Sequence, residues 1–158
     1  MNQIRVHEEH VRKRRGDRGP QPIDNPRTAL EVWIYPKHDE LLLLDEVNTH
    51  LQADGLCKGV KTRDGLLSTT ELFLALVRFY QKQSHLPIEI IAPSAGERGK
   101  TAKIGLNRDE LEEWLSVQDA LTKKLGKPGK TACKPIVAML SLAHFYLKHR
   151  KNLAPQVV

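Results

Sequence analysis

The chain has 158 residues, a formal net charge of +6 and a pI near 9.4. This length provides one hydrophobic core, or one core shared by two similar halves, and the positive charge favours an acidic partner such as nucleic acid or an anionic surface. No apolar stretch approaches the length of a membrane span, and the N-terminus lacks the apolar segment of a secretory signal, so no membrane partner is expected.

Residues 1–29 are predicted to form a disordered basic arm. The sequence there is basic and then proline-rich, without the apolar repeat that lets a helix dock. Two interpretations stay open: a solvated tail, or an arm that neutralises DNA phosphates. In the second interpretation the contacting residues are Arg12, Lys13, Arg14 and Arg15.

The first ordered elements are a strand and a helix. Residues 30–35 are rich in β-branched and aromatic side chains, which predicts a strand, and Pro36 ends it. Residues 39–53 carry apolar side chains at spacings of three and four, which predicts an amphipathic helix, and Gly55 stops that helix.

A second helix is predicted from Ser68-Thr69-Thr70-Glu71 to about Gln83. The hydroxyl and the glutamate have the spacing of a capping box. The apolar residues of this helix lie nearly all round it, so we expect it to be central and buried. After it, residues 88–92 are interpreted as a possible short strand, and residues 93–100 as a flexible loop.

The same order of elements follows again. Residues 101–106 predict a strand, and Asn107 with Glu110 predicts the cap of a helix that Gly126 closes. A last helix is predicted from Pro135, a residue type favoured in the first turn.

An internal repeat relates these two parts of the chain. A shift of 70 places the Asp-Glu-Leu of residues 39–41 on residues 109–111, and a shift of 66 places the Phe-Tyr of residues 79–80 on residues 145–146. Duplicated units of this kind are built to pack on each other. We therefore expect one domain over 30–151, within an organisation of arm, first copy, linker, second copy and tail at residues 1–29, 30–86, 87–100, 101–151 and 152–158.

A lone strand of five or six residues leaves both of its edges unpaired, and a second copy can supply a partner. We expect residues 31–35 to pair antiparallel with residues 102–106, with four helices covering one face of the ribbon. The predicted fold class is mainly α with a short β-ribbon, made of two tandem strand-helix-helix units.

Residues 103–114 carry an alternating strand, a cap after the last leucine, and apolar residues five and eight positions beyond that leucine. Together with Ser68-Thr69-Thr70-Glu71-Leu72, this segment resembles the ribbon-helix-helix superfamily, the Arc and MetJ class of DNA-binding proteins. Two copies in one chain are similar to the TraY type, relaxosome accessory proteins of conjugative plasmids. The resemblance implies an intramolecular pseudo-dimer that binds double-stranded DNA as a relaxosome accessory or transcriptional repressor. It also raises further self-association on DNA and contacts with other nucleoprotein components.

A two-stranded ribbon fits the major groove, and its outward side chains reach base edges. Lys can contact guanine O6 and N7, and Thr can contact a base edge or the thymine methyl group. For the two aromatic residues of the first strand, core packing remains the alternative. The residues expected to face DNA are Glu31, Trp33, Tyr35, Thr101, Lys103 and Gly105.

The resemblance further implies that the starts of the second helices contact phosphate. Free N–H groups and the helix dipole favour an anion there. The residues concerned are Ser68 and Thr69 in the first copy, and Lys130 and Thr131 in the second.

Two other functions compete with DNA reading. Residues 94–101 differ by one glycine from the phosphate loop GxxxxGK[ST], but Gly105 and Asn107 interrupt the long helix that such a loop must open, so nucleotide binding is the least favoured. The aromatic face of the first strand favours a non-catalytic assembly subunit that binds protein or the nucleic-acid backbone.

The sequence shows no nucleophile–base pair and no metal-ligand cluster, so we expect neither an enzyme nor a bound cofactor. Cys57 and Cys133 lie far apart, one in the connector of each copy. A reduced, cytoplasmic protein is the expectation.

Overall fold

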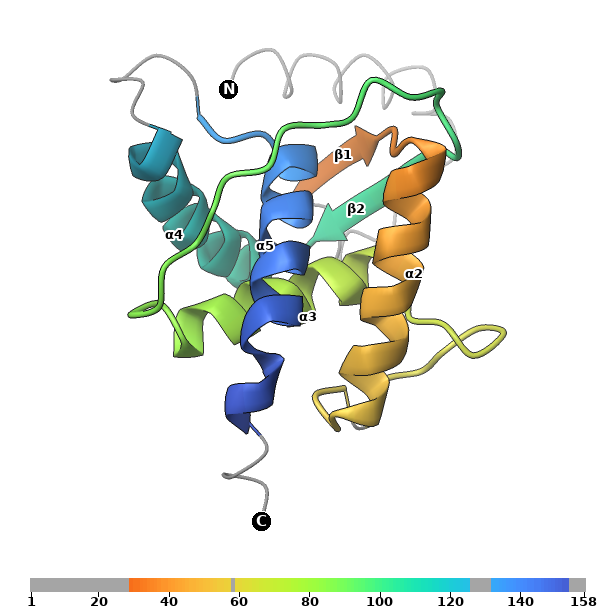
Figure 1. Ribbon diagram of the computed structural model, residues 1–158, viewed down its shortest axis with the longest axis horizontal. Helices are drawn as coiled ribbons and strands as arrows, with labels where there is room; N and C mark the ends of the chain where they lie inside the picture. Colours follow the sequence, from red (N-terminus) through yellow and green to blue (C-terminus); the bar gives the residue numbers. More distant parts are fainter. Residues whose placement is uncertain (1–28, 58, 126–131, 154–158) are drawn as a thin grey trace, which may run out of the picture.

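The computed structural model describes residues 29–57, 59–125 and 132–153. Those residues form four α-helices and one two-stranded antiparallel sheet, so the expected mainly helical class with a short ribbon is confirmed (Figure 1). In chain order the elements are β1 (Leu30–Ile34), α2 (His38–Ala53), α3 (Thr69–Lys82), β2 (Ala102–Leu106), α4 (Arg108–Leu125), α5 (Pro135–His149) and the short 3-10 helix η2 (Arg150–Leu153).

The two strands form the predicted antiparallel ribbon. Val32 lies opposite Ile104, and Trp33 lies opposite Lys103. Because side chains alternate along a strand, one face of the ribbon turns towards the helices. Ile34, Ile104 and Leu106 are buried on that face. The expected pairing is therefore confirmed, with β1 beginning at Leu30 and ending at Ile34.

Helix α3 occupies the centre of the core, as predicted. It packs against α4, α5 and β2. Phe73 meets the Trp114 ring edge-on at 5.1 Å between centroids, and Phe79 meets Tyr146 at the same distance. Helix α5 packs in turn on α2 and on β1, so the second helix of each half contacts the first helix of the other (Figure 1).

Buried glutamates fix the starts of α2 and α4. The Lys37 N–H donates to Glu40 Oε1 at 2.8 Å, and the Asn107 N–H donates to Glu110 Oε1 at 2.9 Å. The Asn107 side chain also accepts from the Glu110 N–H at 2.8 Å, which confirms the predicted cap. These two glutamates are the residues that the repeat superposes, so the same local device begins both helices.

Residues 88–92 do not form a strand, and that prediction is wrong. Ile88 and Ile90 are half-buried and pack against the core. The Ile91 N–H donates to the Ser141 hydroxyl on α5 at 2.8 Å. The apolar residues of this segment thus pack on the core, and its backbone bonds to α5 instead of pairing in a sheet.

Candidate nucleic-acid interface

The outward side of the ribbon is an exposed, mixed aromatic and charged surface. Trp33 is 55% exposed and Tyr35 is 44% exposed. These two residues therefore do not pack in the core, which was the alternative prediction. Glu31, Thr101 and Lys103 are also exposed. We call these five residues the ribbon face.

Gly105 was expected on the ribbon face and is instead buried. Its N–H donates to the Thr70 hydroxyl at 3.0 Å, because the first turn of α3 covers this part of β2. Gly105 therefore contributes to the contact between ribbon and helix and presents no surface to a groove.

Each exposed ring of the ribbon face has a cation beside it. Lys103 Nζ lies 5.7 Å from the centroid of Trp33, and Arg98 Cζ lies 4.5 Å from the centroid of Tyr35. Lys103 also lies 3.5 Å from Glu31 Oε2. Such an exposed pair is worth at most about 1 kcal/mol, so another polar ligand can displace it.

The contact of Arg98 with Tyr35 and the pairing of Glu31 with Lys103 were not predicted. The Glu31–Lys103 pair is diagonal across the two strands, and diagonal neighbours follow from the register once the pairing is known. The position of Arg98 follows from the path of a loop and has no comparable signal in the sequence.

The starts of both second helices lie against the ribbon (Figure 1). Thr70, in the first turn of α3, accepts a hydrogen bond from the Gly105 N–H of β2, and Ile136, in the first turn of α5, lines a hollow beside β1. Ser68 caps α3 with its hydroxyl, which accepts the Glu71 N–H at 3.2 Å. The remaining predicted contacts lie outside the described residues: Arg12, Lys13, Arg14, Arg15, Lys130 and Thr131.

The loop that resembles a phosphate loop lies against the start of α2. The Gly99 N–H donates to the Pro36 carbonyl at 2.8 Å. A Cβ at Gly99 would come within 2.5 Å of Leu41 Cδ1 and 3.3 Å of the Pro36 oxygen, so close approach explains this glycine. Residues 94–101 lead directly into β2, whereas a phosphate loop must open a helix.

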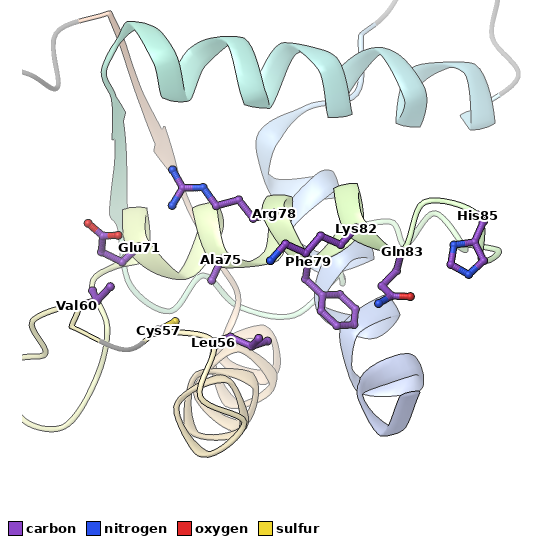
Figure 2. Close-up of a pocket in the computed structure, with 10 residues that line it drawn as sticks. All are labelled: Leu56, Cys57, Val60, Glu71, Ala75, Arg78, Phe79, Lys82, Gln83 and His85. Carbon is purple, nitrogen blue, oxygen red and sulfur yellow. The ribbon is translucent and has the colours of Figure 1, made fainter. Parts of the chain in front are cut away.

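A separate cleft of about 470 Å³ lies between α3 and the connector that precedes it (Figure 2). Its charges are mixed, because Glu71 lies on the same wall as Arg78 and Lys82. The Arg78 guanidinium is held by Glu113 at 2.8 and 3.0 Å, and this hydrogen-bonded carboxylate raises the pKa of Arg78. The cleft thus presents mixed charges, and one of its cations is already paired with a carboxylate.

Within the described ranges, no group of three or more His, Cys, Asp or Glu residues is placed to hold a metal ion. None of the helices in those ranges is long and apolar enough to cross a membrane. Comparisons of the chain with family models, with curated proteins and with solved structures give no match.

Proposed function

We propose that the chain is a tandem ribbon-helix-helix pseudo-dimer that binds double-stranded DNA through the ribbon face. One observation carries the proposal: a two-stranded ribbon with one exposed side has the start of α3 beside β2 and the start of α5 beside β1. A ribbon of this width fits the major groove. Helix starts on its two sides can then present N–H groups to the phosphates that border the groove.

The polar residues of the ribbon face supply the base contacts. Lys103 donates to guanine O6 and N7, and Glu31 accepts from cytosine N4, which are the pairings that major-groove geometry favours. Because their ion pair is exposed, separating the two side chains costs little. Thr101, next to the start of β2, contacts a base edge or a thymine methyl group.

Contacts with the phosphates of the DNA backbone give the remaining affinity. In the proposal, phosphates contact Ser68 and Thr69 at the start of α3 and Lys134 at the start of α5. The basic residues at 12–15 and the pair at 130–131 extend this contact in the proposal. Such contacts position the protein without reading sequence, and salt weakens them. Either a relaxosome accessory or a repressor would use this chemistry.

The test compares two lysines. Duplex sites are selected from a randomised pool, and affinities for selected and random DNA are measured by fluorescence anisotropy. Lys103→Ala is expected to cost about 1–3 kcal/mol at the selected site and little on random DNA. Lys123→Ala is the matched control, because Lys123 lies in the last turn of α4 and is paired with Asp119 at 3.2 Å.

The control should change both affinities slightly and equally. If Lys103→Ala weakens selected and random DNA to the same extent, the ribbon does not read bases and the proposal fails. If no site is selected at all, duplex recognition itself is wrong.

A second candidate is a non-catalytic assembly subunit. The exposure of Trp33 and Tyr35 favours it, because large exposed aromatic side chains are typical anchors of protein interfaces. Unchanged DNA binding by Trp33→Ala would support this candidate. Nucleotide binding by residues 94–101 is the weakest alternative, and calorimetric titration with ATP should show no binding.

A further inference from the structure

A hollow of about 500 Å³ lies beside β1, next to the start of α5. This volume is within the range of small-molecule sites. Val32, Ile34 and Ile136 supply apolar walls, together with Pro93 and Pro135. We call this site the β1–α5 hollow. Its walls suit a flat apolar group better than a solvated ion.

Two aromatic residues of the ribbon face also border the β1–α5 hollow. Both residues line the hollow, and both side chains are exposed. An exposed aromatic ring can stack on a planar base.

The charged residues around the hollow are all cations. Lys37, Arg98 and Lys134 line it, and no Asp or Glu belongs to the described residues that do so. Exposed aromatic side chains combined with cations are the usual means of binding unpaired nucleotides, because rings stack on bases and cations meet the backbone. An anionic group such as a phosphate matches the sign of these charges.

We propose that the β1–α5 hollow binds one unpaired nucleotide of a DNA strand, with its base against Trp33 and Tyr35 and its phosphate near Lys134. The inference rests on the proposed function, since both place DNA on the ribbon, and it adds that the preferred DNA contains an unpaired base. Extruding a base from a perfect duplex costs a few kcal/mol, and a mismatched or bulged base costs least. The protein should therefore prefer a bulged duplex to a perfect one.

The experiment measures the affinity ratio between a bulged duplex and the matching perfect duplex by fluorescence anisotropy at fixed salt. The two duplexes have the same sequence apart from the bulged base, and this sequence is either a selected site or an arbitrary one. The affinity for one of the separated strands is measured as well. Trp33→Ala removes one ring, and Ile136→Trp fills the hollow without removing a ring or a charge. Leu42→Ala is the control, because Leu42 is 72% exposed on α2.

Wild-type protein is expected to bind the bulged duplex more tightly. Trp33→Ala should weaken that binding by about 5- to 150-fold, the loss typical of one base–aromatic stack, and should bring the ratio towards one. Ile136→Trp should also bring the ratio towards one, and Leu42→Ala should keep it. Thermal melts of each variant establish that its fold is intact.

The outcomes separate the two proposals. A wild-type ratio of one, or a ratio that survives both Trp33→Ala and Ile136→Trp, overturns the hollow as a nucleotide site and leaves duplex reading in place. Binding to the bulged and single-stranded DNA without any selectable duplex site overturns the proposed function and supports the hollow.

Discussion

The α3–α4 and α2–α5 contacts both join the two halves of the chain, yet different chemistry stabilises them. At α3–α4, the Phe73 and Trp114 rings pack edge to face, and the exposed Arg78–Glu113 ion pair lies at the rim. At α2–α5, Asp54 directly follows α2. Its carboxylate accepts hydrogen bonds from the Tyr146 hydroxyl and from the guanidinium of Arg150, which directly follows α5.

The ion pairs at the two contacts differ in how far their side chains are exposed to solvent. The side chains of Asp54 and Arg150 are 19% and 26% exposed, whereas those of Glu113 and Arg78 are 29% and 48% exposed. A polar contact contributes more where water competes less. The two contacts between helices therefore rely on different chemistry, with packed rings at α3–α4 and a sheltered polar cluster at α2–α5.

The largest expected effect is at the ring pair of α3–α4. Trp114→Ala should lower the free energy of unfolding by about 3–5 kcal/mol, because the buried indole leaves a cavity against Phe73. Trp33→Ala is the matched control and should change stability little, since its indole is mostly exposed. Urea denaturation measures both. Similar losses for the two tryptophans would contradict the assignment of Trp33 to the surface.

The polar cluster of α2–α5 comes next. Asp54→Ala should cost about 1–3 kcal/mol, because it leaves the buried Tyr146 hydroxyl without this acceptor. Burial, and then the Asp54 carboxylate, raise the pKa of Tyr146. Glu113→Ala, at the exposed rim of α3–α4, should cost less. Equal losses of unfolding free energy for Asp54→Ala and Glu113→Ala in urea denaturation would show that exposure to solvent does not distinguish the two contacts.

The cysteines of the two connectors should also differ. Cys133 is buried, and burial raises its pKa to about 11, while Cys57 is half-exposed and burial raises its pKa as well. Iodoacetamide should therefore modify Cys57 first and Cys133 only on unfolding, as followed by mass spectrometry. Equal rates would contradict the burial of Cys133.

The raised pKa of Cys133 also predicts how stability depends on pH. The folded protein holds the proton of the Cys133 thiol more tightly than the unfolded chain does, because the pKa of this thiol is near 9.0 in the unfolded chain. The stability from the protonated thiol is complete below pH 9 and is lost as pH rises towards about 11. Cys133→Ser should flatten the dependence of the urea midpoint on pH in this window. An unchanged slope would rule out Cys133 as its cause.

The smallest effect is expected for the exposed ion pair of α3–α4. A double-mutant cycle of Arg78→Ala and Glu113→Ala should give a coupling of about 0.2–1 kcal/mol, which added salt reduces. The corresponding cycle of Asp54→Ala and Arg150→Ala should give a larger coupling that salt reduces less. A reversed order would invert the comparison of the two contacts.

Local rules were enough to predict much of the fold. The cap at Asn107, the start of the last helix at Pro135 and the burial of α3 all depend on spacing within one segment, and the structure has each of them. The outward position of Trp33 also follows from alternation, once its neighbour Ile34 is placed in the core.

Features that depend on tertiary packing were not predicted. The apolar residues at 88 and 90 pack against the core without a partner strand, so periodicity alone suggested a strand that the structure does not have there. Gly105 is buried because of where the first turn of α3 lies. The β1–α5 hollow needs the loop carrying Arg98 and the start of α5 to meet beside β1, and no single segment contains that information.

The most direct test of DNA binding by the ribbon face is an NMR titration of the ¹⁵N-labelled protein with a selected duplex. Binding through the ribbon face predicts that the largest shift changes fall on the Trp33 indole, on Lys103 and on the first turns of α3 and α5. Changes concentrated instead around the cleft of Figure 2, at Cys57 and Lys82, with the ribbon signals unmoved, would contradict it.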